Sequence, residues 1–291
     1  MKLYSFGEIL FDTFEDTHTL GGAPLNVAAH FRQLGGESAI ISALGNDELG
    51  REAFIDIEKL GIDASMISVL DKVPTGIASI TMKGNDADYE FSYPAAWDRI
   101  EIYDEDIDAI EDDSILYFGT LALRSTTSFL ALERIIGETS PEEIFVDVNI
   151  RKDFYSDELI GFCLDNATIL KINDDEIDLI CSVIGLDTCD GSSLFSWLSE
   201  NTAIHTLLLT RGKHGSDCFT LDGGKIHEEC SSVHVVDTVG AGDSLSAAFL
   251  FFRYEKKLSV SEALHKATAV ADFVVGHKGA IPLYDRTMFS D

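Results

Sequence analysis

The densest group of residues that could carry out chemistry ends at Asp243. Three small residues, Gly240, Ala241 and Gly242, come directly before it, at the start of a long amphipathic segment that is predicted to be a helix. The backbone N–H groups of such small residues can approach a ligand closely, and the positive end of the following helix points to the same place. This pattern predicts an anion hole for a transferring phosphoryl group, with Asp243 as the base that accepts the proton of an attacking hydroxyl. The alternative is a glycine-rich turn in which Asp243 only caps a helix.

A second group of candidate residues lies near the N-terminus. Gly21 and Gly22 would let a polyhydroxyl ligand contact the backbone, and Asn26, in the first turn of a predicted helix, offers both a donor and an acceptor. Asp12 closes an apolar segment, at the kind of strand end where α/β sheets bind ligands. These residues predict a site for a small polyhydroxyl molecule. A glycine loop, a helix start and a capping Asp would be the alternative interpretation.

Both groups resemble signatures of the ribokinase-like (PfkB) carbohydrate kinase family, and the nearest likeness is to bacterial fructokinases. The string Asp-Thr-x-Gly-Ala-Gly-Asp-Ser spans 237–244, Gly-Gly-Ala-Pro-x-Asn spans 21–26, and Gly-Glu-Ile-Leu-x-Asp spans 7–12. They stand in the family's order, so the resemblance covers essentially the whole chain. It implies transfer of the γ-phosphate of ATP to a hydroxyl of a small sugar, foremost D-fructose to fructose 6-phosphate, with Mg²⁺ and, in several members, a monovalent cation such as K⁺.

The resemblance also implies roles for residues in the middle of the chain. Asn149 and Arg151 correspond to the border of the active cleft, with Arg151 as a candidate phosphate clamp, although a solvated salt bridge is an equal alternative. Asn173 and Glu176 match the family's Asn-x-x-Glu motif, which contacts Mg²⁺ through water, but the same spacing is an ordinary capping box. Lys171 could face the nucleotide or pair with an acid.

Two further segments resemble the family's nucleotide site. The first is the predicted turn formed by Thr210, Arg211, Gly212 and Gly215, for which a surface turn is the alternative. The second surrounds Gly279 and resembles the loop that closes over adenine. In several family members that loop also supplies ligands for a monovalent cation, and Asp237 would then be nearby.

Substrate choice is expected to depend on a small lid. Two alternating segments, 76–83 and 89–93, flank Gly84-Asn85-Asp86 without an intervening helix, which predicts an antiparallel β lid inserted at about 73–100. Trp97, at the end of this lid, lies in an Ala-Trp-Asp segment that resembles a bacterial fructokinase subgroup, and it would pack on the sugar or anchor the lid. Other fructokinases carry an Arg just before this segment, which is absent here.

That departure leaves other activities open. A ribokinase, a nucleoside kinase or a 2-keto-3-deoxygluconate kinase of the same family are the alternatives. A non-catalytic sensor is disfavoured because a sensor needs no base. A dinucleotide-binding oxidoreductase is not indicated, since no Gly-x-Gly-x-x-Gly follows the first predicted strand.

The elements that must position these residues alternate between strand and helix. Apolar strand patterns occur at 2–11, 38–44, 115–123, 144–148, 168–172 and 206–209, with a hairpin at 217–221 and 225–229. Helical patterns occur at 24–34, 48–60, 125–137, 174–184, 194–200, 241–256 and 260–275. This alternation predicts one α/β domain over 1–291: a three-layer, doubly wound, mostly parallel sheet of the ribokinase-like class, carrying the lid.

The composition restricts the partners. Asp and Glu total 51 against 21 Lys and Arg, a formal net charge of −30, so the surface repels nucleic acid and anionic lipid. Without an apolar segment of about 18 residues, no membrane span is expected. Five cysteines lack any Cys-x-x-Cys spacing, which predicts reduced thiols in the cytoplasm and no disulfide framework or zinc site. The exposed strands of the lid would allow a homodimer.

Overall fold

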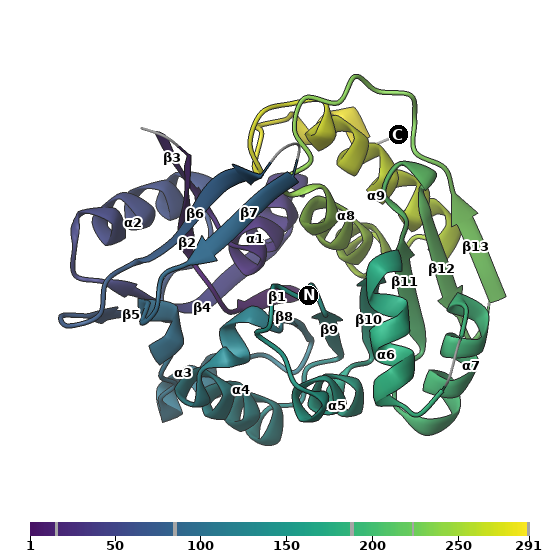
Figure 1. The fold of residues 1–291 in the computed structure, drawn as a ribbon, viewed down its shortest axis with the longest axis horizontal. Coiled ribbons are helices and arrows are strands. Elements are labelled where there is room, and N and C mark those ends of the chain that lie inside the picture. The colour runs from purple at the N-terminus through teal and green to yellow at the C-terminus, as the bar shows by residue number, and fades with distance from the viewer. Residues whose placement is uncertain (15–16, 84–85, 187–188, 223, 290–291) are drawn as a thin grey trace.

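A mostly parallel β-sheet runs through the middle of the molecule in this computed structural model, which describes residues 1–14, 17–83, 86–186, 189–222 and 224–289 (Figure 1). In spatial order its strands within these residues are β13 (Gly224–Glu228), β12 (Ser216–Thr220), β11 (Thr206–Thr210), β10 (Ile169–Asn173), β9 (Glu143–Asp147), β8 (Ser114–Gly119), β1 (Lys2–Phe6), β4 (Glu37–Gly45) and β5 (Ile67–Leu70). The β11–β12 and β12–β13 pairs are antiparallel, and the other neighbours pair in parallel.

Helices cover both faces of this sheet (Figure 1). On one face lie α1 (Ala23–Leu34), α2 (Glu48–Leu60), α8 (Ala241–Leu250) and α9 (Val260–Val275). On the other lie α3 (Asp104–Ala109), α4 (Thr126–Glu138), α5 (Asp157–Asn166), α6 (Ile177–Val183) and α7 (Gly191–Asn201). Successive strand residues point to opposite cores, as Leu3 and Tyr4 do. The expected three-layer, doubly wound architecture is therefore confirmed.

Most predicted elements form, and their ends follow local sequence signals. Helix α1 has Pro24 in its first turn and ends at Gly35, whose φ of 108° only glycine adopts readily. Ser259 and Glu262 form the expected capping box of α9. Two short helices, α3 and α5, were not expected. The predicted helix 241–256 continues past α8 as a π-helical turn, Phe251–Glu255.

The prediction of one strand over 2–11 is wrong. The strand stops at Phe6, and Gly7, with φ of 142°, redirects the chain into a second strand, β2 (Leu10–Phe14). Strand β2 leaves the main sheet and enters the lid. An apolar pattern does not reveal such a break, because Leu10 and Phe11 at the start of β2 are buried and apolar like Leu3, Tyr4 and Phe6 of β1.

The lid is a second sheet and is larger than the expected insertion. Within the described ranges its strands, in spatial order, are β3 (Thr17–Gly21), β2, β6 (Gly76–Lys83) and β7 (Asp86–Phe91). The β2–β3 and β6–β7 pairs are antiparallel, whereas β2 and β6 are parallel. Figure 1 shows this sheet at the upper left, beside α1 and α2. The expected turn residues Gly84 and Asn85 lie outside the described residues.

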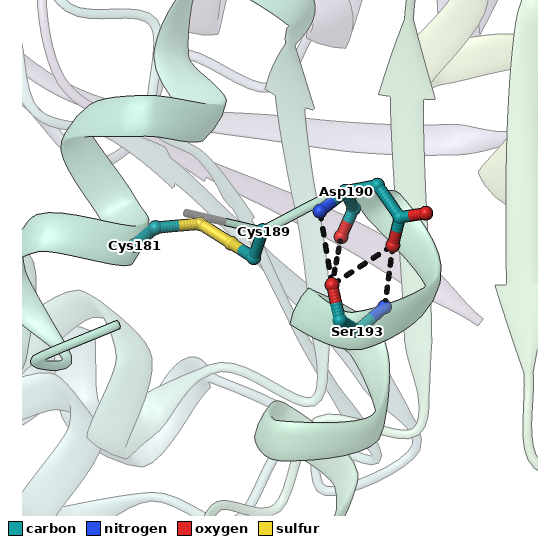
Figure 2. The surroundings of a disulfide bond; sticks show 4 residues. All are labelled: Cys181, Cys189, Asp190 and Ser193. Carbon is teal, nitrogen blue, oxygen red and sulfur yellow. Dashed lines mark hydrogen bonds between the residues drawn. A yellow bond between two sulfur atoms is a disulfide. The ribbon is translucent and has the colours of Figure 1, made fainter. Parts of the chain in front are cut away.

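The structure pairs Cys181 with Cys189 in a disulfide, so the prediction of reduced thiols is wrong for these two residues (Figure 2). Their Cα atoms are 6.3 Å apart, within the range that a disulfide bridges. The bond joins α6 to the segment before α7, where Asp190 caps that helix by accepting the N–H of Ser193. The eight-residue separation gave no recognised motif, because the pairing depends on how the chain turns between the two helices.

The other cysteines are free. Cys163 and Cys218 are buried, and Cys230 is partly exposed. Among the helices of the described chain, none has both the length and the apolar character required to traverse a bilayer.

Candidate active site

A cavity of about 340 Å³ lies where the lid meets the ends of the central strands. Its lining residues are Glu8, Leu10, Asp12, Gly22, Ala23, Asn26, Tyr89, Phe91, Leu121, Asn149, Arg151, Lys171, Asn173, Thr210, Thr238, Val239, Gly240, Gly242 and Asp243. They come from the loop after β1, the lid, α1, the turn after β8, the ends of β9 to β11 and the start of α8. The cavity therefore gathers most of the residues that the sequence singled out.

Asp243 and Asn26 meet in this cavity although they are far apart in the chain. The Asn26 amide Nδ2 donates a hydrogen bond to Asp243 Oδ2 at 2.7 Å. Desolvation raises the pKa of Asp243 to about 6, the nearby Asp147 adds to the rise, and the Asn26 hydrogen bond and the cations Lys171 and Arg151 oppose it. A carboxylate with a pKa near 6 is ionised at neutral pH and still basic enough to accept a proton.

The turn before Asp243 presents glycine backbone to the cavity. Gly240 has φ of 78°, and a Cβ atom there would lie 2.6 Å from the Ala280 carbonyl oxygen. A Cβ on Gly242 would come within 3.3 Å of the Lys171 ammonium nitrogen. Ala241 is not among the lining residues, and its N–H donates to the Thr238 carbonyl at 3.3 Å. Of the three residues expected to form the anion hole, Gly240 and Gly242 therefore face the cavity.

Lys171 both lines the cavity and pairs with an acid. Its Nζ donates to Asp147 Oδ2 at 2.7 Å, and both side chains are buried. Burial lowers the pKa of Lys171, but the carboxylates of Asp147, Glu176 and Asp243 together outweigh that effect, and the pKa is raised overall. Lys171 therefore stays positively charged beside Gly242, where it can attract an anion. The role of Asp147 was not anticipated, although it ends its strand as Asp12 was expected to do.

The sugar-side residues also converge. Asp12 lines the cavity, and desolvation raises its pKa to about 6, with Arg151 opposing and Asp243 adding to the rise. A Cβ on Gly21 would lie 2.8 Å from Asp12 Oδ2. Gly22 has φ of 113°, and a Cβ there would lie 2.3 Å from the Glu8 carbonyl oxygen. Gly22 is therefore required both by a close contact with backbone and by its conformation, whereas at Gly21 a side chain would crowd the Asp12 carboxylate.

Asn149 and Arg151 approach the cavity from the loop that follows β9. Asn149 has φ of 40°, an uncommon value for a residue other than glycine. The Arg151 guanidinium lies 6.0 Å from the ring centre of Tyr89, which belongs to the lid. The loop and the lid thus face each other across the cavity.

Glu8 is a cavity residue that the sequence analysis missed. It is 4% exposed, and its Oε2 has no hydrogen-bond partner among the described residues. Burial raises its pKa to about 7, and the negative charge of Asp243 adds to the rise. Its position within the Gly-Glu-Ile-Leu-x-Asp segment is the available signal, but the motif alone does not show that this side chain faces the cavity.

Glu176 and Asp237, the expected metal contacts, organise backbone in this structure. The two Glu176 carboxylate oxygens accept the N–H groups of Ile150 at 2.7 Å and Asn173 at 2.9 Å, so the capping box forms. Asp237 accepts the N–H groups of Val239 at 3.1 Å and Gly279 at 3.0 Å. The described part of the chain contains no group of three or more His, Cys, Asp or Glu side chains arranged to hold a metal ion.

Trp97, which was expected either to pack on the sugar or to anchor the lid, does not line the cavity. Its ring is 1% exposed and lies so close to Gly76, the first residue of β6, that a Cβ there would be 2.3 Å from the indole nitrogen. The Arg124 guanidinium covers its other side, 3.9 Å from the ring centre. Trp97 therefore anchors the lid, which was its alternative interpretation.

The expected nucleotide turn reaches the cavity only through Thr210. Arg211 turns aside and bonds the buried Asp217 through Nε at 2.9 Å and Nη2 at 2.8 Å. Gly212 and Gly215 have φ of 51° and 83° and shape the tight turn without lining the cavity. The sequence could not show that Asp217, on the next strand, competes for Arg211.

Comparison with known proteins gives a consistent result. The family model described as pfkB family carbohydrate kinase matches residues 2–286. A fructokinase of Solanum tuberosum is 28% identical over 308 residues, covering 96% of this chain and 91% of the relative, and a probable fructokinase-5 of Arabidopsis thaliana is 27% identical, covering 96% and 93%.

Solved structures share the fold. A fructokinase with bound ATP from Xylella fastidiosa has a TM-score of 0.85 at 19% identity, covering 99% of this chain and 97% of that one. An aminoimidazole riboside kinase from Salmonella enterica, complexed with its riboside and an ATP analogue, has a TM-score of 0.82 at 24% identity, covering 99% of both chains. At these identities the likeness establishes the fold and leaves the substrate open.

Proposed function

The chain belongs to the pfkB family of carbohydrate kinases, and we propose that it transfers the γ-phosphate of ATP to the C6 hydroxyl of D-fructose. One observation carries this proposal. The Asn26–Asp243 hydrogen bond joins the glycine loop at 21–26 to the glycine-lined start of α8 inside one cavity. A sugar hydroxyl and a phosphate bound on these two sides would therefore meet beside the Asp243 carboxylate.

The proposed reaction is direct displacement at the γ-phosphorus. Asp12, Gly22 and Asn26 hold the sugar, and Asp243 accepts the proton of its hydroxyl as the oxygen attacks phosphorus. The new O–P bond forms as the bond to the β-phosphate oxygen breaks, and ADP leaves with the electron pair. The N–H groups of Gly240 and Gly242 and the Lys171 ammonium stabilise the negative charge that spreads over the phosphoryl oxygens.

Mg²⁺ carried by ATP would neutralise part of the triphosphate charge. Both oxygens of Glu176 already accept backbone N–H groups, and we propose that this residue contacts the ion through bound water, the arrangement that Mg²⁺ commonly retains. Asp237 and the Gly279 loop are the proposed location for a monovalent cation. Thr210, Asn149 and Arg151 are proposed to contact the phosphates or the sugar from the ends of β11 and β9.

Fructose is the proposed sugar because the curated relatives reported above are described as fructokinases and the Ala96-Trp97-Asp98 segment resembles that subgroup. Their identity to this chain is below 30%, so the choice of sugar needs direct measurement. The sugar must also fit a cavity with three carboxylates, Glu8, Asp12 and Asp243, which favours a neutral polyol over a sugar phosphate or a sugar acid.

A coupled assay for ADP release tests this proposal. Fructose, ribose, a nucleoside and 2-keto-3-deoxygluconate are compared at equal ATP and Mg²⁺ concentrations, with Asp243→Asn as the control for background hydrolysis. We expect kcat/KM to be at least about tenfold higher for fructose than for the others. A higher value for another compound would replace fructose. Sugar binding by calorimetry without ADP release from any of them would contradict kinase activity and favour a sensor.

A further inference from the structure

His30 is a buried polar residue that the proposed reaction does not use. It lies on α1, is 0% exposed, and follows Asn26 by one helical turn. Its two ring nitrogens both have partners on the C-terminal segment. Nε2 lies 2.8 Å from the Ala280 carbonyl oxygen and Nδ1 lies 3.1 Å from the Tyr284 hydroxyl.

The hydrogen positions on this ring follow from its partners. A carbonyl oxygen can only accept, so Nε2 must carry the hydrogen that it donates to Ala280. Nδ1 is then the acceptor, and the Tyr284 hydroxyl donates to it. Burial lowers the pKa of His30 to about 4, although the hydrogen bond to Ala280 opposes this, so the ring is neutral at the pH where enzymes of this kind work. The hydrogen bonds of His30 are therefore made by a neutral ring in one fixed orientation.

Ala280, the residue that His30 holds, supports the phosphate side of the cavity. A Cβ on Gly240 would be 2.6 Å from the Ala280 carbonyl oxygen and 2.8 Å from its Cα, so the two backbones are in direct contact. Nearby, the Gly279 N–H binds Asp237, and the Val236 N–H donates to the Val275 carbonyl at 2.9 Å. The segment 275–280 therefore packs against the turn at 236–240 and supports it.

Core packing alone does not account for a histidine at this position. A leucine would fill a similar volume without the cost of desolvating two ring nitrogens, and the hydrogen bonds only offset that cost. What the imidazole adds is a directed contact with one carbonyl, 250 residues away in the chain. That contact fixes where Ala280, and with it Gly240, can lie.

We propose that His30 is a positioning residue, which locks the glycine turn of the phosphate site to the sugar-binding helix. Asn26 and His30, four residues apart, lie on the same side of α1. Asn26 holds Asp243, and His30 holds Ala280, which packs against Gly240. One helix therefore sets the distance between the base and the phosphate-stabilising amides. This inference rests on the proposed function. It concerns the rate of transfer, because the sugar contacts themselves do not involve His30.

Steady-state kinetics test it with two substitutions. His30→Leu removes the donor and leaves the Ala280 carbonyl unpartnered, whereas His30→Gln keeps an amide donor at about the same reach. We expect His30→Leu to lower kcat at least about tenfold while the KM for the sugar changes less than about twofold, because preorganised amides act mainly in the transition state. His30→Gln should recover most of kcat.

Leu198→Ala is the matched control. Leu198 lies on α7, across the main sheet, and is 0% exposed, so its loss should destabilise the fold as much as His30→Leu does. With the amount of folded protein measured by thermal denaturation, the control should keep the wild-type kcat. Equal loss of kcat in both variants would assign His30 a purely structural role and overturn the proposal.

Hydrogen exchange gives a readout that does not need turnover. The amides of 238–242 and 275–280 should exchange faster in His30→Leu than in the wild type and in Leu198→Ala. If the wild type phosphorylates no sugar, the proposed function fails. The exchange result still decides whether the contact between His30 and Ala280 holds the two segments in place. If His30→Leu does not fold, His30→Asn, whose side chain is too short to reach Ala280, replaces it. Wild-type kcat and wild-type exchange in either variant would refute the inference.

Discussion

At the residue scale, Asp243 combines a raised pKa with a position between the two sides of the cavity. We expect Asp243→Ala to lower kcat by about a thousandfold or more, because general-base catalysis and orientation of the hydroxyl are both lost. The fold and ATP binding should persist, since the Gly240–Gly242 backbone and Lys171 are untouched. The measurements are ADP release, thermal denaturation and calorimetric binding of ATP. Near-normal turnover would remove Asp243 from the mechanism.

The raised pKa of Asp243 also predicts how the rate depends on pH. Only the ionised carboxylate can accept a proton, and desolvation raises the pKa of this group to about 6, so kcat/KM should fall as the pH drops through about 6. Asn26 donates to the ionised carboxylate and holds its pKa down. Asn26→Leu should therefore move the fall in rate to higher pH. A profile from pH 4.5 to 9 in both proteins tests this, and an unchanged midpoint in the variant would argue against the assignment.

Glu8 makes a prediction about stability. Its pKa is raised to about 7 by burial, so the folded protein binds this proton more tightly than the unfolded chain does. Stability is therefore lost as the pH rises from the ordinary pKa of a glutamate to about 7, and the full loss is present above that pH. We expect Glu8→Gln to raise the free energy of unfolding at pH 8 by up to about 3 kcal/mol and to change it little near pH 4.5. Urea titrations at the two pH values measure this, and a gain of equal size at both would contradict it.

At the element scale, the attachment of the lid depends on Arg124. This side chain bonds Asp98 at 2.8 and 2.9 Å and the Ser92 carbonyl at 2.6 Å, and it covers Trp97. Both members of the ion pair are almost fully buried. Arg124→Ala would leave Asp98 charged and unpaired, which should lower the free energy of unfolding by about 3 kcal/mol or more. It should also raise the KM for the sugar, because Ser92 and Asp98 flank the return of the lid to the main sheet.

Arg134→Ala is the comparison for that lid variant. Arg134 pairs with Glu138 and Asp104, whose side chains are exposed so that solvent screens the charges, and it also donates to the Ile102 carbonyl at 3.0 Å. We expect little change in unfolding or in the KM for the sugar. Chemical denaturation and sugar kinetics of both variants measure the difference. Equal effects of the two substitutions would show that the buried position of Arg124 has no special importance.

Elements whose signals are local could be predicted from the sequence. Gly35 and Gly61 end their helices in the left-handed conformation, and Asp190 and Asp47 cap helices by accepting N–H groups within the first turn. The glycine segments around Gly22 and Gly240 were also readable, because close approach and positive φ both demand glycine there. Periodicity and short motifs contain this information.

Contacts whose partners are set by the tertiary fold could not be predicted in this way. The transfer of β2 into the lid depends on its pairing with β6. The Lys171–Asp147 pair depends on the ends of two adjacent strands lying side by side. Arg211 turns away from the cavity because the buried Asp217 binds it. Each of these is decided by which partner the fold supplies, and the residue type alone permits several. The pairing of Cys181 with Cys189 likewise depends on the fold. Trp97 could have packed against many hydrophobic surfaces, so its buried position was not predictable from its type.

At the scale of the whole molecule, the lid offers two edges for association. Within the described residues, β3 and β7 lie at the edges of the lid sheet, and open strand edges can pair with another chain. The formal net charge of −30 per chain opposes that pairing. Because salt screens repulsion between like charges over about 10 Å at 0.1 M, association should strengthen as salt is added.

We therefore propose a homodimer formed through the lid, populated more at 300 mM than at 20 mM NaCl. Analytical ultracentrifugation at both concentrations measures its formation, and hydrogen exchange locates the contact. Amides of β3 or β7 should exchange more slowly in the dimer, whereas β13, at the edge of the main sheet, serves as the control and should not change. Since a lid held by a second chain would also close less freely, the KM for the sugar should shift with protein concentration in the range where the dimer dissociates. A dimer that weakens with salt, or one that protects β13 instead, would exclude this arrangement.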